Sequence, residues 1–178
     1  AVRGAAGGGG EGAPSAPAAP AQRWWTEVSE VCPISQFPVH LLPYPPFKLQ
    51  VQPLSHQPPM SKLERDQKQR DNTKLIDGPY LMLQVLSSWN FEVLGRPLND
   101  EDISQLDAYM KRCKLGPFRL SRALELAKQE SPEAQQELDL LRQRARRRLD
   151  GLKHIQRVRC NRTGGAAAAC GGGAGAGP

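Results

Sequence analysis

Large apolar residues recur at helical spacing in one stretch of the chain, residues 75–130. Its first part predicts a helix that begins after Asp77, a good N-cap, with Pro79 in the first turn, where backbone N–H groups lack partners anyway. Apolar side chains surround much of this helix, which is therefore expected to be the most buried one: Tyr80, Leu81, Met82, Leu83, Val85, Leu86 and Trp89.

A second helix is predicted after Asn99, another favourable N-cap, because the acidic run 100–102 suits the positive end of the helix dipole. Its inner stripe comprises Ile103, Leu106, Met110 and Cys113, and the Gly116–Pro117 pair ends it. Between the two helices, residues 90–98 favour a tiny hairpin. A third helical pattern follows over residues 118–129.

A long helix is predicted from the Ser131–Pro132 pair to about Val158. Its apolar positions step by three or four residues: Leu138, Leu141, Ala145, Leu149, Leu152 and Ile155. So narrow a stripe is typical of a coiled-coil seam. Gly151 within it weakens the helix by about 1 kcal/mol relative to alanine.

Residues 23–60 form a proline-rich arm. Eight prolines between Pro33 and Pro59 exclude regular helix, yet the segment carries many apolar residues. We expect an extended arm packed across the helical core, and the alternation in residues 47–51 (FKLQV) allows a short edge strand. Five apolar residues of this arm are the candidates for contact with a protein partner: Phe37, Leu41, Leu42, Tyr44 and Phe47.

The complete prediction is an all-α fold with a small three- to four-helix core over residues 75–130. The arm lies before this core in the chain, and a polar helical linker over residues 61–74 joins the two. In the linker, Ser61 and Glu64 form a capping box. A long basic amphipathic helix over 131–160 follows the core. Residues 1–22 and 161–178 are rich in Ala and Gly and are predicted to be disordered tails.

Charge sharpens the interpretation of the C-terminal helix. The chain has a net charge of +6, but residues 142–162 contain nine Lys or Arg against one acid, Asp150, so the remainder is slightly acidic. This segment could bind RNA or another polyanion, a partner helix, or a membrane surface. The polyanion-binding candidates are Arg142, Arg144, Arg146, Arg147, Arg148, Lys153, Arg157 and Arg159.

Catalytic chemistry is not indicated. The three histidines, His40, His56 and His154, lie in the arm or on the basic helix, with no nucleophile elbow and no phosphate-binding loop. We predict no catalytic residue, cofactor or metal site. Residues 99–129 also have the dimensions of a helix-turn-helix, in which Arg119 and Arg122 would approach DNA, although a helical hairpin explains the pattern more simply.

The run Cys32-Pro33-Ile34-Ser35, with Pro38-Val39 after it, resembles the opening of RING and U-box ubiquitin-ligase domains. The resemblance implies a degenerate U-box-like module at residues 32–39. The four cysteines are too widely spaced to supply the zinc ligands of a RING domain.

The favoured function is a non-catalytic protein-interaction module within a larger assembly, with RNA or polyanion binding as the alternative. Few, scattered cysteines are typical of a reduced intracellular protein. We expect the cytoplasm or nucleus, with organellar import as a further option given the Ala/Gly/Pro-rich start. No apolar run reaches 18 residues, so no transmembrane helix is predicted.

Overall fold

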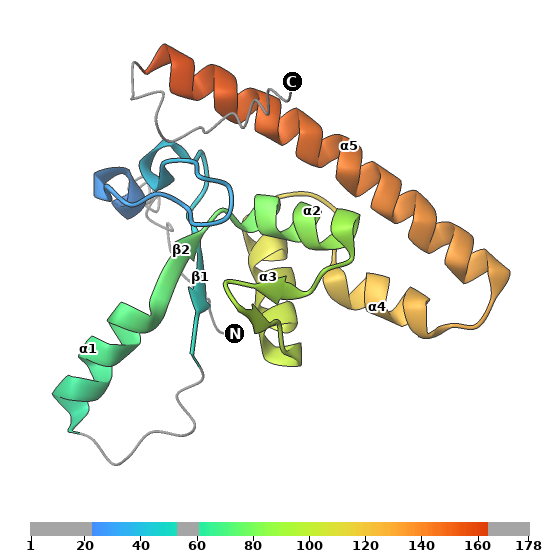
Figure 1. Cartoon of the computed structure of the whole chain (residues 1–178), viewed down its shortest axis with the longest axis horizontal. Coiled ribbons are helices and arrows are strands. Elements are labelled where there is room, and N and C mark those ends of the chain that lie inside the picture. The colour runs from blue at the N-terminus through green and yellow to red at the C-terminus, as the bar shows by residue number, and fades with distance from the viewer. Residues whose placement is uncertain (1–22, 53–60, 164–178) are drawn as a thin grey trace, which may run out of the picture.

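The long helix α5 (Pro132–Arg162) runs along one side of the protein, and the other helices lie beneath it (Figure 1). This computed structural model describes residues 23–52 and 61–163. Helix α5 packs most extensively on α2 (Gly78–Ser88) and also on α4 (Leu120–Lys128), while α3 (Asp100–Arg112) packs beneath α2 and α4. The described part of the chain is thus mostly helical.

The predicted helix starts are confirmed by side-chain caps. The Asp77 carboxylate accepts a hydrogen bond from the backbone N–H of Tyr80 at 3.2 Å and caps α2. Asn99 caps α3 in a capping box with Asp102, and Ser131 caps α5. Each cap satisfies an N–H group that has no partner inside its helix. The predicted small hairpin is also present, as β3 (Glu92–Val93) and β4 (Arg96–Pro97).

The all-α prediction is only partly correct, because the fold includes a small antiparallel sheet. Strand β1 (Phe47–Gln50) pairs with β2 (Thr73–Ile76), with Phe47 opposite Ile76. The predicted polar linker therefore divides into helix α1 (Lys62–Asn72) and the start of β2. The capping box between Ser61 and Glu64 is present, and α1 has no buried residue. This helix projects away from the core at the end of the two strands (Figure 1).

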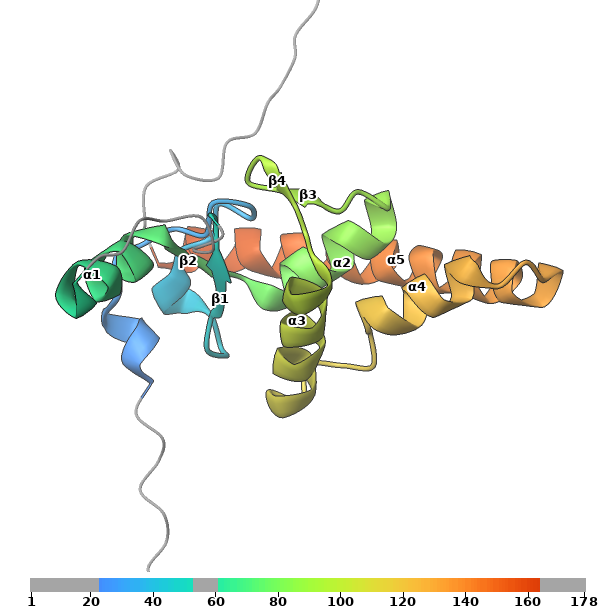
Figure 2. The same ribbon diagram turned by 90° about the horizontal axis from the view of Figure 1, so that it is seen from below.

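The proline-rich arm packs against the helical core, as the sequence indicates. It contains two short 3-10 helices, η1 (Trp24–Glu27) and η2 (Val39–Leu41), before it reaches β1. A small apolar cluster joins the arm to the last turns of α5: Trp25, Phe37, Val39, Leu42 and Cys160. Figure 2 shows the arm and the two strands gathered at the C-terminal end of α5. The arm and α5 therefore support each other.

The inner stripe of α5 differs from the predicted seam at one position. Ile155 is 50% exposed, and Gln156 takes the inner place with 7% exposure. The buried positions of α5 therefore repeat every eleven residues: Ala145 follows Ala134 at this spacing, and Leu149 follows Leu138. An eleven-residue repeat fits a nearly straight helix better than the seven-residue repeat of a coiled coil. The stripe packs within the chain, on α2 and α4.

The predicted tails 1–22 and 161–178 lie outside the described residues, apart from 161–163. Over these, α5 continues to Arg162, beyond the predicted end of the helix. Residues 53–60 of the arm also lie outside the described ranges.

Candidate interaction surfaces

A buried carboxylate connects three distant parts of the chain. The Asp77 side chain has no exposed surface. Besides the backbone of Tyr80, it accepts hydrogen bonds from the Tyr44 hydroxyl at 3.0 Å and from Nε2 of Gln156 at 2.5 Å. The Asp77 backbone N–H points to Sγ of Cys32 at 3.3 Å. We call this set of residues the Asp77 junction, since it joins the arm, the start of α2 and the last turns of α5.

Burial determines the protonation behaviour of the junction. Loss of water around Asp77 raises the pKa of its carboxyl group, against the opposing effect of its three hydrogen-bond donors. Burial also raises the pKa of Tyr44, reinforced by the neighbouring Asp77 charge, so this phenol stays protonated as a donor. The junction is a fully connected polar network, which rigidifies its surroundings.

The α5 groove lies beside this junction, between α5 and the turn that connects α3 to α4. Its volume is about 630 Å³. Its walls are largely apolar and come from the arm, α2, α3, the turn and α5: Tyr44, Pro79, Leu83, Met110, Leu115, Gly116, Phe118, Gly151, Leu152 and Ile155. Tyr44 and Gln156 both donate hydrogen bonds to Asp77. The junction therefore ties the Tyr44 wall of the groove to α5.

The rim of the α5 groove is positively charged. Lys114, Arg147 and Arg148 line it, and all three residues are exposed. Within residues 23–52 and 61–163, none of the three forms an ion pair with an acidic side chain. The lining that the described residues provide contains no acidic side chain. An apolar floor with an uncompensated basic rim attracts an acidic ligand that carries apolar side chains.

The exposed apolar surface of α5 continues from the groove. Ile155 is 50% exposed and Val158 is 36% exposed. At about 3.6 residues per turn, these residues and Gly151 share one side of α5 with Arg144 and Arg147. Contiguous apolar surface rimmed by polar groups marks interaction sites on soluble domains.

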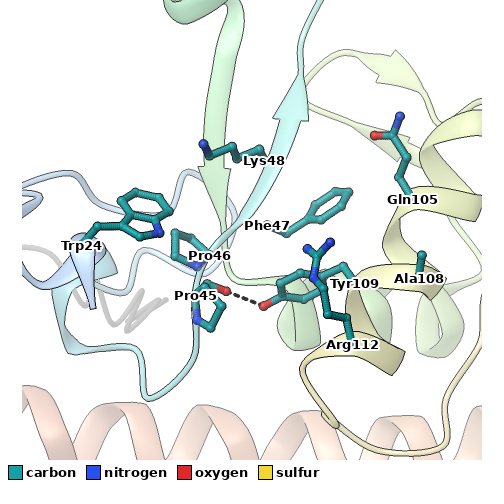
Figure 3. A pocket seen from close by; sticks show the side chains of 9 residues that line it. All are labelled: Trp24, Pro45, Pro46, Phe47, Lys48, Gln105, Ala108, Tyr109 and Arg112. Carbon is teal, nitrogen blue, oxygen red and sulfur yellow. Dashed lines mark hydrogen bonds between the residues drawn. The ribbon is translucent and has the colours of Figure 1, made fainter. Parts of the chain in front are cut away.

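A second pocket, the arm pocket, lies where the arm meets α3 and has a volume of about 500 Å³ (Figure 3). The residues that line this pocket contact one another. The Tyr109 hydroxyl donates to the carbonyl oxygen of Pro45 at 2.6 Å, and the Tyr109 and Phe47 rings lie 5.4 Å apart. Lys48 Nζ lies 5.1 Å from the centre of the Trp24 ring. We interpret this pocket as the joint that holds the arm on α3.

The predicted polyanion-binding residues divide into two groups. Two of them cover aromatic rings of the core, Arg142 above Trp89 at 5.7 Å and Lys153 above Tyr80 at 5.9 Å. The other six are exposed and have no acidic partner among the described residues: Arg144, Arg146, Arg147, Arg148, Arg157 and Arg159. They lie on both flanks of α5, as expected from their spacing.

The predicted partner-contacting residues of the arm are largely turned inward. Phe37, Leu42 and Phe47 are at most 5% exposed, because they pack within the two apolar clusters. Leu41 and Tyr44 keep part of their surface exposed. Of the five, Tyr44 is the residue that reaches the α5 groove.

The remaining sequence features have structural partners. Arg122 pairs with Glu125 and Glu137, and Arg119 bonds to the carbonyl oxygens of Gly116 and Phe118, so the two residues of the helix-turn-helix hypothesis contact their own fold. Cys32 is fully buried, and its Sγ accepts from backbone N–H groups. Among the described residues there is no cluster of three or more potential metal ligands.

Comparisons with known proteins add no family to these observations. No family model, no curated protein and no solved structure matches the chain. Within the described ranges, no helix is both long enough and apolar enough to cross a membrane.

The α5 groove was missed in the sequence because five separate segments build it. One local signal could have indicated it. Leu140, Gly151 and Val158 interrupt the outer, arginine-rich side of the helix at roughly helical spacing, and Ile155, predicted for the inner stripe, lies on the same side. A contiguous row of apolar residues on the outer side of a helix is typical of an interaction surface.

Proposed function

We propose that this protein is a non-catalytic protein-interaction module whose partner binds in the α5 groove. The observation that carries the proposal is the combination of an apolar floor, a basic rim that forms no ion pair within the described ranges, and adjacent exposed Ile155. Binding sites of protein partners typically have an apolar centre and a polar rim. The junction around Asp77 supports the proposal because it provides a rigid wall.

Site-specific photo-crosslinking tests this proposal. We expect p-benzoylphenylalanine placed at Ile155 in the full chain to give discrete protein adducts in a cell extract. Leu63 on α1 is a matched control position, since it is 81% exposed and does not line the groove. Adducts from position 155 but not from 63 are the expected result. Equal adducts from both positions, or none from 155, would contradict a partner site in the groove.

A second candidate function is binding of RNA through α5, and the six exposed arginines that have no acidic partner in residues 23–52 and 61–163 favour it. If RNA binds, changing Arg144, Arg146, Arg147 and Arg148 together to glutamine should weaken it strongly. It should also reduce the slope of log affinity against log salt concentration by about 3, at roughly 0.7 per phosphate contact. A fluorescence titration with single-stranded RNA at several salt concentrations measures both. Absence of binding at low salt would exclude this function.

A further inference from the structure

We infer that the occupant of the α5 groove is an acidic amphipathic helix of a partner protein. This inference rests on the proposed function and specifies the chemistry of the partner. No strand of the described part of the chain lines the groove, so an extended peptide would find no sheet edge there to which it could add. The occupant must bind through side chains, which an amphipathic helix presents along one face.

The dimensions of the groove agree with a helical occupant. Along α5 the lining runs from Arg147 to Ile155, about 12 Å at 1.5 Å per residue. This length accommodates about two helical turns, so two or three apolar anchors spaced by three or four residues would reach the floor. Met110 and Leu83 are buried lining residues, with 1% and 6% exposure.

Charge complementarity indicates which residue type flanks the apolar face of the bound helix. Arg147 and Arg148 lie on the α5 side of the groove, and Lys114 lies on the side of the α3–α4 turn. Among the described residues, no acidic side chain lines the groove between these cations. Acidic residues on both flanks of the occupant's apolar face would meet these cations. RNA suits the groove less well, since its aromatic lining among the described residues consists of Phe118, which is only 7% exposed, and Tyr44, which is half-buried.

The chain itself does not supply such a segment outside the described ranges. Residues 1–22, 53–60 and 164–178 contain a single acid, Glu11, and few large apolar residues. Their sequences therefore lack the acidic amphipathic pattern that the groove requires. We therefore place the occupant in a partner protein and not in these segments.

Gly151 provides a way to fill the groove without disturbing the fold. It lines the groove, and a Cβ atom built on it meets no atom within 4 Å. Leucine at this position would occupy the space that the partner's apolar anchors need, and it also favours helix. Gly151→Ala is the matched control, since it makes the same gain in helix propensity with little added volume.

The test uses a fluorescein-labelled amphipathic helical peptide of about 18 residues, roughly 27 Å long, with leucine on one face and glutamate on its flanks. We expect anisotropy titrations with the full chain to show binding that weakens about tenfold or more when the peptide's glutamates become glutamines. Gly151→Leu should weaken it by a similar factor, and Gly151→Ala by about twofold at most.

Two charge-reversal pairs locate the contact on α5. Arg147→Glu with Arg148→Glu removes rim cations, whereas Arg146→Glu with Arg157→Glu makes the same change in net charge on the opposite flank of α5, outside the groove lining. Loss of binding by about tenfold or more in the first pair, with a much smaller loss in the second, supports the inference. Equal losses would show attraction to the whole basic helix and would overturn it.

Other outcomes are equally decisive. Unchanged binding by Gly151→Leu would place the peptide elsewhere, and a dimer that Gly151→Leu dissociates in sedimentation would make a second copy of this chain the occupant. If the acidic peptide fails to bind while position 155 still crosslinks to a protein, the partner's chemistry is wrong and the proposed function stands. If both fail, the proposed function fails as well.

Discussion

Replacing Gly78 with alanine is expected to lower the free energy of unfolding by about 2–3 kcal/mol, the cost of overpacking a tight core. A Cβ atom at this position would lie 2.2 Å from Cε1 of Tyr109 and 2.9 Å from Cζ. The Tyr109 ring has little room to move, because it is 2% exposed, packs on Phe47 and is held at Pro45 through its hydroxyl.

The matched control for this change is Gly151→Ala, also in a helix but facing open space. There alanine should raise the free energy of unfolding by up to about 1 kcal/mol, because it favours helix more than glycine does. Urea denaturation followed by circular dichroism measures both variants. Equal effects of the two substitutions would show that the contact between Gly78 and Tyr109 is not tight.

Replacing Asp77 with alanine is expected to cost about 3 kcal/mol, since it leaves the buried Tyr44 hydroxyl, the Gln156 amide and the Tyr80 N–H without their acceptor. Because Tyr44 and α5 both form walls of the α5 groove, the same variant should lose affinity for a groove ligand under conditions where it remains folded. Asp77→Asn keeps the cap and one acceptor oxygen and should cost about 1 kcal/mol.

The pH dependence of the Asp77 contribution has a defined sign. Burial raises the pKa of this carboxyl group in the folded state above its unfolded value of about 3.9, so between the two values the folded state binds more protons. The contribution of Asp77 to stability is therefore largest below the unfolded pKa, falls as the pH rises toward the folded pKa, and is constant above it. Asp77→Asn should remove this dependence. A wild-type and an Asp77→Asn curve of unfolding free energy against pH that run parallel would contradict the assignment.

Local chemistry made the helix boundaries predictable from the sequence. The caps at Asp77, Asn99 and Ser131 act within a few residues of their own positions, so their sequence pattern suffices. Helix α3 ends at Arg112, before the predicted Gly116–Pro117 stop, because Lys114 already adopts a left-handed φ of 54°. Gly116 adopts a φ of +108°, which only glycine takes without strain. The position of the proline-rich arm on the core also followed from its apolar content.

Long-range pairing was the part that the sequence could not indicate. The pairing of β1 with β2 depends on a contact between Phe47 and Ile76, and the strand in residues 73–76 has no clear alternation of its own. Likewise Ile155 was predicted for the inner stripe of α5, but Gln156 takes the inner place. It lies inside because Asp77, 79 residues earlier, accepts its hydrogen bond. Such a partner satisfies a buried amide but leaves no local trace in the sequence.

The positive charge of the candidate site could be predicted from the sequence, but the shape of the groove could not. Arg147 and Arg148 were identified from the basic run, and Tyr44 from the arm. The apolar floor they border depends on Met110 and Leu83, which the sequence assigns simply to the core. The groove forms where this floor meets α5 and the α3–α4 turn, and Gly151 lines it on the α5 side.

The central claim is that a protein partner occupies the α5 groove, and crosslinking in the presence of a competitor tests it most directly. Adducts formed by p-benzoylphenylalanine at Ile155 should fall as the acidic amphipathic peptide is added in excess, while the glutamine form of the peptide leaves them unchanged. Position 155 is suited to this because half of its surface is exposed at the edge of the groove. Adducts that persist at saturating acidic peptide would show that the partner binds elsewhere, and would contradict the claim.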